Sequence, residues 1–270
     1  MLGKDFKEQS KIIEDNWNRL RAFINETFPT RSVELNRMYD DFEERMCLLP
    51  ASGTEHYHNA FPGGYVDHIL RVIEFSVAEY EHWKRMGLKV DNFSLEELKF
   101  AALHHDLGKV GFQGKHESYL PNPSDWHRKN QGKIYTHNPR TPFVLVPDMS
   151  LFLLQSYGIR MSFQEMLAIR THDGVYDRAN ESYYFSSQVD SRPRTNINQI
   201  LHNADFMAAR FEFERWINHT NRPFFYSDEM LEIPVEAPVI QKSGPSKIEI
   251  AKDGMDAFEK MMDELVPKGK

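Results

Sequence analysis

Hydrophobic residues recur at every third or fourth position through most of the first 216 residues. This spacing predicts amphipathic helices. The first two are predicted over residues 5–27 and about 32–48, with Pro29 between them. Both are predicted to be packing elements that carry no chemistry of their own.

The widest apolar arc follows over residues 65–85 and predicts a helix at the centre of the fold. His68 falls within this arc, beside Ile69. A single histidine on an apolar face is more often a core residue with a hydrogen-bond partner than a ligand. His68 is therefore a candidate ligand only because further candidate ligands follow it in the sequence.

The next helix is predicted from Ser94, where the order Ser-Leu-Glu-Glu forms a capping box, to about Asp106. His105 comes seven residues after Leu98 and so lies on the same buried face. Asp106 lies at the helix end, where its side chain can face the same position as that of His105. Gly108 is predicted to take the left-handed conformation that ends many helices.

Three further helices are predicted over residues 149–157, 162–170 and 196–216. Asp205 lies among small apolar residues in the last of them, and His172 follows the second. His172 is a candidate ligand or proton donor, or else a cation that stabilises the helix end.

The remaining segments show no helical period. Residues 54–64 predict a loop, and residues 111–147 are long, polar and rich in aromatic and cationic side chains. The second stretch is predicted to be a loop insertion that closes over an anionic substrate, or else a solvated insertion. Residues 222–250 predict an extended arm or small hairpin, followed by a short helix at about 254–265.

Together these patterns predict an all-α fold that forms one structural unit in three parts. Residues 1–49 supply helices that pack on the core, residues 50–220 form the core itself, and residues 221–270 form a C-terminal arm with a short helix.

The composition is that of a soluble globular protein, with 40% hydrophobic residues and a net charge of −7. An acidic balance argues against a long nucleic acid as the main partner. No apolar run approaches the ~20 residues of a membrane span. The polar N-terminus does not resemble a secretory signal, and the single cysteine fits a reducing compartment, so we expect a cytoplasmic protein without a membrane partner.

Ionisable residues within apolar helices are the strongest functional signal. A carboxylate or imidazole buried without a partner is costly. A divalent ion accepts imidazole nitrogen and carboxylate oxygen together, and its charge offsets that of the carboxylates. The sequence therefore predicts a metal site made of His68, His105, Asp106 and Asp205.

The order of these four ligands, each on its own helix apart from the adjacent His-Asp pair, resembles the H…HD…D pattern of the HD-domain metal-dependent phosphohydrolases. The resemblance covers residues 50–216 and is most specific in Gly-Gly-Tyr-Val-Asp-His at 63–68 and Leu-His-His-Asp-Leu-Gly-Lys at 103–109. Residues 50–60 also resemble the lead-in of the 3′→5′ exoribonuclease branch and of relaxase-associated HD domains. The resemblance implies an HD-domain helical bundle that binds a divalent ion (Mn, Fe, Co, Ni, Zn or Mg).

The family also implies hydrolysis of a phosphate ester, most often a nucleotide or a short oligonucleotide, so we expect a small phosphorylated substrate. Proton transfer is assigned to His172 or to the second carboxylate oxygen of Asp106. Candidates for holding the phosphate or the substrate are His58, Lys109, Arg128 and Lys133. His58 could equally bond the loop backbone, and for the loop cations Arg128 and Lys133 a solvated surface position is the commoner role.

Dinuclear members of the family place two further histidines after the His-Asp pair. His172 resembles the second, but no histidine stands near residues 146–148, where the first would fall, although His137 lies in the preceding loop. One ion is therefore expected, with a second as an alternative. Two other functions stay open: a dinuclear iron oxygenase of the same fold, and a catalytically idle module that binds a nucleotide. The sequence gives no indication of the oligomeric state.

Overall fold

A computed structural model of the chain describes residues 6–112, 117–185, 188 and 194–219. All of them belong to one compact unit, Met1–Phe224. The predicted C-terminal arm and the helix at 254–265 lie outside the described residues. Within the described ranges, no helix combines the length and the apolar character that crossing a membrane requires.

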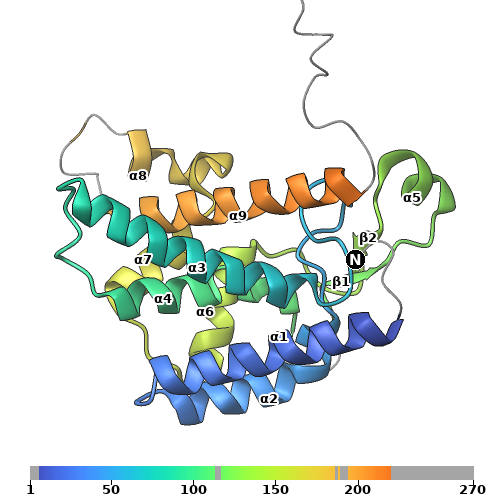
Figure 1. Ribbon diagram of the computed structural model, residues 1–270, viewed down its shortest axis with the longest axis horizontal. Helices are drawn as coiled ribbons and strands as arrows, with labels where there is room; N and C mark the ends of the chain where they lie inside the picture. The colour runs from blue at the N-terminus through green and yellow to red at the C-terminus, as the bar shows by residue number, and fades with distance from the viewer. Residues whose placement is uncertain (1–5, 113–116, 186–187, 189–193, 220–270) are drawn as a thin grey trace, which may run out of the picture. The chain divides into compact units, whose positions relative to one another are not determined.

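The described part of the chain is predominantly helical, as predicted (Figure 1). The α-helices are α1 (Phe6–Thr27), α2 (Ser32–Leu48), α3 (Gly64–Arg85), α4 (Leu95–His104), α5 (Asp125–Gln131), α6 (Val146–Ser156), α7 (Phe163–Thr171), α8 (Glu181–Phe185) and α9 (Ile197–His219). Short 3₁₀ helices occur at Leu107–Val110, Gly174–Tyr176 and Arg178–Asn180. Two strands, β1 (Tyr119–Pro121) and β2 (Tyr135–His137), form a small antiparallel hairpin.

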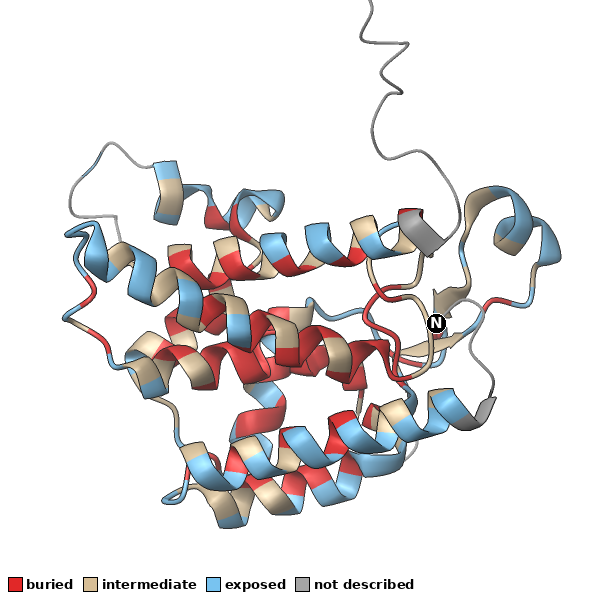
Figure 2. Ribbon diagram, in the orientation of Figure 1, coloured by how far each residue is buried: buried red, intermediate tan, exposed pale blue. Residues whose placement is uncertain are grey.

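Helix α3 lies at the centre, packed against α9 on one side and α4 on another (Figure 1). Helices α1 and α2 lie side by side and cover a further side of α3. Figure 2 shows that the buried residues concentrate along α3 and α4. Val72 on α3 and Leu98 and Ala101 on α4 are completely buried, which agrees with the broad apolar arc that the sequence shows for α3.

The start of α3 depends on Gly63. Its φ of 83° lies in the left-handed region that favours glycine, and a Cβ there would come within 2.6 Å of the Ile13 side chain on α1. This turn lets α3 begin directly after the 54–62 loop, so that His68 lies one turn into the helix.

Helix α4 begins as predicted, with the capping box between Ser94 and Glu97. Its end differs from the prediction. The helix stops at His104, and a 3₁₀ turn follows from Leu107. The prediction that Gly108 is left-handed is wrong, because the positive φ of 87° belongs to Gly111.

Gly108 is needed for close packing instead. A Cβ at this position would lie 2.2 Å from the backbone oxygen of Val146 at the start of α6. The backbone N–H of Gly108 also donates to the Ser150 hydroxyl on α6, at 2.7 Å. The turn after the His-Asp pair is therefore locked to α6.

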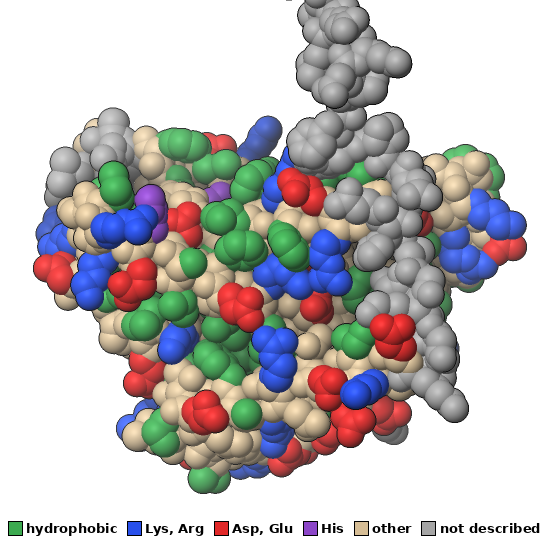
Figure 3. Space-filling view, in the orientation of Figure 1, with side chains coloured by type: hydrophobic (Ala, Val, Ile, Leu, Met, Phe, Trp, Pro, Cys, Tyr) green, Lys and Arg blue, Asp and Glu red, His purple; other side chains and the backbone are tan. Residues whose placement is uncertain are grey.

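The 111–147 segment contains more regular structure than the sequence predicted. It holds the β1–β2 hairpin and α5, and an antiparallel bridge between Thr54 and Lys133 joins it to the 54–64 loop. In Figure 3, Lys and Arg side chains gather on the projecting α5 segment. Two of them, Arg128 and Lys129, lie in the last turn of α5.

Candidate metal centre

Five ionisable side chains converge where α3, α4, α7 and α9 meet. His68 comes from α3 and Asp205 from α9, whereas His105 and His172 occupy the C-cap positions of α4 and α7. Asp106 follows His105 directly. The structure therefore brings together the four predicted metal ligands and His172, which lie 33 to 137 residues apart along the chain, apart from the adjacent pair.

The distances between the ligand atoms suit a single small cation. His68 Nε2 lies 3.2 Å from Asp205 Oδ1 and 3.7 Å from Asp106 Oδ2. His105 Nε2 lies 3.5 Å from Asp106 Oδ2 and 3.8 Å from Asp205 Oδ1. Two ligand atoms held ~2.1 Å from one ion at tetrahedral or octahedral angles are about 3.0–3.5 Å apart. These four spacings lie within about 0.3 Å of that range. The ligand atoms that all lie within 4.8 Å of one another form two overlapping groups: His68, His105 and Asp205, and His105, Asp106 and His172.

Each imidazole of the cluster uses its Nδ1 away from the centre. His105 Nδ1 bonds the carbonyl oxygen three residues before it, at 2.8 Å, and His172 Nδ1 does the same at 2.9 Å. A carbonyl oxygen can only accept, so both rings carry the proton on Nδ1. In His105, whose ring is neutral, the lone pair is then on Nε2, the atom that faces the cluster.

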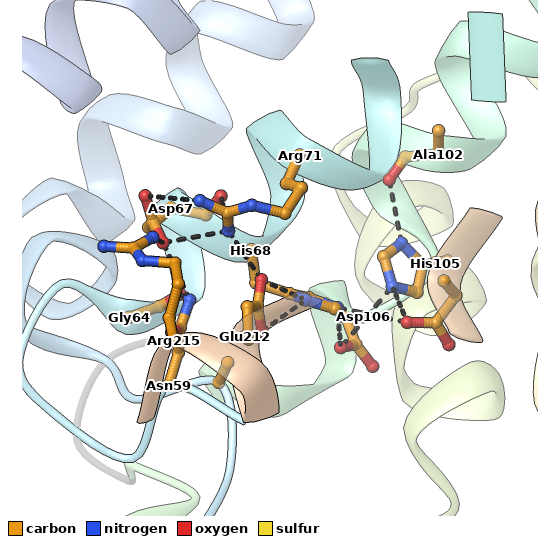
Figure 4. A network of polar contacts seen from close by, with 12 residues as sticks. Asn59, Gly64, Asp67, His68, Arg71, Ala102, His105, Asp106, Glu212 and Arg215 are labelled. Carbon is orange, nitrogen blue, oxygen red and sulfur yellow. Dashed lines mark hydrogen bonds and ion pairs between the residues drawn. The ribbon is translucent and has the colours of Figure 1, made fainter. Parts of the chain in front are cut away.

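His68 is oriented by a carboxylate instead. Its Nδ1 lies 3.1 Å from Glu212 Oε1 on α9, and Glu212 is buried. Glu212 also accepts from Arg71 at 2.7 Å, and Arg71 bonds Asp67 at 2.9 Å (Figure 4). A carboxylate behind a metal-ligating histidine fixes the ring and makes it a better ligand.

Sequence reasoning missed Glu212. A signal was present, because Glu212 follows Asp205 by seven residues and therefore lies on the same face of the helix. The pairing of Glu212 with His68 joins positions 144 residues apart, which helix periodicity does not reveal.

Two buried nitrogen atoms in the cluster, His68 Nε2 and His105 Nε2, make no hydrogen bond of suitable geometry, and their polar neighbours are the carboxylates of Asp106 and Asp205 at 3.2–3.8 Å. Both rings are completely buried. An unsatisfied buried nitrogen is unfavourable unless something else binds it. Both atoms point at the carboxylates Asp106 and Asp205, so the donor set fits a divalent ion.

The charges of the cluster shift its pKa values in opposite directions. Burial alone would lower the pKa of His68, but Glu212 and Asp205 outweigh it and raise that pKa to about 10. Burial lowers the pKa of His105 to about 4. Asp106 and Asp205 keep pKa values well below the usual range despite burial, Asp106 mainly through Lys109 and His105, and Asp205 mainly through its contact with His68.

Lys109 lies beside the cluster and lines the cavity next to it. Its Nζ donates to Asp106 Oδ2 at 2.5 Å and to the backbone oxygen of Ala51 at 2.8 Å. Its side chain is 12% exposed, so the ammonium group is held in place beside the carboxylate rather than in bulk water.

A cavity of about 290 Å³ opens onto the cluster. His58, Asp106, Lys109, His172 and Asp205 line its polar side. The other side is apolar and consists of residues 143–146, of which Phe143 is the most exposed. His58 is neutral there, because burial and the nearby Lys109 lower its pKa to about 3.

The structure does not bring Arg128 and Lys133 to this cavity. Arg128 bonds Asp125 and the backbone of Asn122, and Lys133 is exposed next to its bridge with Thr54. Their predicted contact with a phosphate therefore has no support in the observed arrangement.

In comparisons with protein-family models, with curated proteins and with solved structures, nothing matches this chain.

Proposed function

We propose that this protein is an HD-type phosphohydrolase that uses a divalent ion to hydrolyse a phosphate ester. The observation that carries the proposal is the convergence of two buried Nε2 atoms, on His68 and His105, with the buried carboxylate of Asp106 and the half-buried carboxylate of Asp205 beside a cavity. The order of the ligands along the chain, which resembles the HD phosphohydrolases, supports the same function.

His68, His105, Asp106 and Asp205 would hold the ion. When bound, a divalent cation offsets the charge that develops on a phosphoryl group and lowers the pKa of water. Four protein ligands with further positions open favour a six-coordinate ion over closed tetrahedral zinc. Mn, Fe, Co, Ni and Mg are therefore favoured over a structural zinc ion as the bound metal.

His172 is the proton donor in this proposal. Its Nε2 lies 3.7 Å from Asp106 Oδ1 and lines the cavity. Burial alone would lower the pKa of His172, but Asp106 and Asp173 raise it to about 9, so the ring carries a proton at neutral pH. A protonated imidazole at this place can pass its proton to the oxygen of a leaving group.

Lys109 supplies the positive charge for the phosphate. Its ammonium group lines the same cavity, and Asp106 with Ala51 holds it there. Lys109 has three N–H donors, and these two contacts leave one for a phosphoryl oxygen.

A second ion is the less favoured arrangement. Among the described residues, two groups could hold an ion: His68, His105 and Asp205, and His105, Asp106 and His172. Since His105 has a single available nitrogen, Nε2, two ions would compete for it. A dinuclear iron oxygenase is therefore less well supported than a hydrolase with one ion.

Phosphate release tests the proposal. Wild-type protein, stripped of metal and then supplied with Mn²⁺, Co²⁺ or Mg²⁺, is expected to release phosphate from a panel of phosphate monoesters and diesters. Asp106→Asn is expected to abolish release, whereas Asp125→Asn, an exposed carboxylate on α5, should leave it unchanged. Bound metal without hydrolysis of any compound would point to the idle binding module. Two irons with oxygen consumption would point to the oxygenase.

A further inference from the structure

A second cavity, of about 670 Å³, lies next to the first and shares His58, Asp173 and Asp205 with it. The character of its wall differs from that of the metal cavity. Aromatic rings from three separate segments line it: Tyr57 from the 54–64 loop, Tyr176 from the 3₁₀ turn after α7, and Phe206 and Phe213 from α9. We call this second cavity the aromatic cleft.

Three of these rings are strongly exposed. Tyr57 is 61% exposed, Tyr176 76% and Phe206 55%. Large aromatic side chains that gather in one exposed concavity mark a binding site more often than scattered ones do. Here they line the same cavity as Asp205, a predicted metal ligand.

The rings are held by ordered backbone. Tyr57 N–H donates to Thr54 at 3.1 Å, and Tyr176 N–H donates to Asp173 at 3.2 Å. Phe206 and Phe213 are seven residues apart and lie on the same side of α9. A cleft whose walls are already in place loses little entropy when a flat ligand enters it.

The side chains that line the aromatic cleft indicate which of three ligand classes it binds: planar heterocycles, cations or aliphatic chains. Arg210 lines the cleft over the ring of Phe213, at 5.5 Å, and pairs with Glu214 at 3.4 Å, so this ring already has a cation over it. His56, His202 and Asp173 add polar edges, which an alkyl chain would leave without partners. A planar heterocycle with hydrogen-bonding edges satisfies both the rings and the polar groups.

We propose that the aromatic cleft binds the base of a nucleoside phosphate, stacked against Tyr57, Tyr176 and Phe206, while its phosphoryl group lies at the metal ligands. The inference rests on the proposed function, because it takes the phosphoryl group to enter the neighbouring metal cavity. The aromatic cleft then decides which phosphate esters are substrates, and the metal centre acts on the phosphate alone.

Calorimetric binding to metal-free protein tests this without any hydrolysis. The probes are the four common ribonucleoside 5′-monophosphates and ribose 5-phosphate, which has the same sugar phosphate but no base. We expect the nucleotides to bind at least about 5-fold more tightly than ribose 5-phosphate, since stacking of one base changes the dissociation constant by roughly 5- to 150-fold. Phosphocholine and an alkyl phosphate serve as the cationic and aliphatic comparisons.

Tyr176→Ala and Phe206→Ala are each expected to weaken nucleotide binding by a similar factor and to leave ribose 5-phosphate unchanged. The matched control is Phe152→Ala, since Phe152 is 54% exposed on α6 and lines neither cavity. This substitution should leave the affinities for the nucleotides and for ribose 5-phosphate unchanged.

Three outcomes would overturn the inference: equal binding of nucleotides and ribose 5-phosphate, equal weakening of both by the two substitutions, or tighter binding of phosphocholine or the alkyl phosphate. Failure of the proposed function looks different. In that case nucleotides would bind with the expected dependence on Tyr176 and Phe206, but the metal-loaded protein would release no phosphate.

Discussion

His68 combines two tasks within one ring. Its Nδ1 faces Glu212, and its Nε2 faces the carboxylates of the metal centre. The ring is completely buried, so neither nitrogen can exchange its partner for water. The quality of His68 as a ligand therefore depends on Glu212, a residue that lies on the side of the ring away from the cluster.

Replacing Glu212 tests this dependence. In Glu212→Gln the charge behind His68 is lost, and we expect the affinity for a divalent ion to fall about 10- to 100-fold, as for other partners of ligating histidines. The matched control is Glu214→Gln on the same helix, whose carboxylate is 44% exposed and pairs with Arg210. Competition with a fluorescent chelator measures both affinities. Equal affinities for the two variants would contradict a role for Glu212.

Binding of a metal ion should also release a proton from His68. In the metal-free protein the pKa of His68 is raised to about 10, so the ring is protonated at pH 7 and must lose a proton to bind an ion. Calorimetry in two buffers of different ionisation enthalpy should therefore show about one proton released per ion. Identical heats in both buffers would show that His68 is already neutral.

The same shift sets the sign of the pH dependence. A raised pKa stabilises the metal-free fold below the unfolded value of about 6.5. This contribution is lost as the pH rises through about 10. The stabilisation that a bound ion provides should consequently grow from pH 6 to pH 9, which thermal unfolding with and without metal can follow.

At the scale of elements, the helix ends position the chemistry. Helices α4 and α7 both stop where a histidine takes the C-cap position, and both begin at a capping box, at Ser94 and Ser162. Both starts were predicted from sequence, and that of α4 rested on its capping box, which is a local pattern. The end of α4 was predicted two residues too late, since the packing of Gly108 against α6 decides it.

Gly108→Ala should reveal that packing. The new Cβ would lie 2.2 Å from the Val146 backbone oxygen and 2.9 Å from the Met149 Cβ. We expect the free energy of unfolding to fall by about 1–3 kcal/mol, the usual cost of overpacking. Gln155→Ala is the control, because Gln155 is exposed on α6, the helix against which Gly108 packs. Chemical denaturation of both variants makes the comparison, and an equal loss in the two would rule out the steric explanation.

At the scale of the whole molecule, helix periodicity predicted most of the helical fold and the helices on which the candidate ligands lie. The apolar arc of α3 and the placement of Asp205 on α9 needed no tertiary information. What could not be predicted depends on pairs that only the folded chain brings together. Arg31 is an example: it bonds Glu165 at 2.8 Å and stacks on Phe100 at 4.0 Å, although neither pairing leaves a trace in local sequence.

The 111–147 segment shows the same limit. Its lack of helical period predicted a loop, whereas the structure contains a hairpin and a short helix. Three-residue strands are too short to show an alternating pattern, and α5 has no buried residue that would produce an apolar stripe.

Metal removal should affect the entire fold, because the ligands come from α3, α4 and α9, three helices that pack on one another. A ligand present at 100 times its dissociation constant adds about 2.7 kcal/mol of stability. For a protein of this size, that corresponds to a rise in Tm of roughly 5–10 °C. Differential scanning calorimetry with excess Mn²⁺ and with EDTA measures it. An unchanged Tm would show that no ion links these helices.

The metal content of the purified protein tests the central claim most directly. After reconstitution with a divalent ion and removal of the excess, plasma mass spectrometry should find about one ion per chain in the wild type. His105→Ala should lose it, and His137→Ala, an exposed histidine on β2, should keep it. Equal metal content in all three proteins, or none in the wild type, would contradict a metal centre at His68, His105, Asp106 and Asp205.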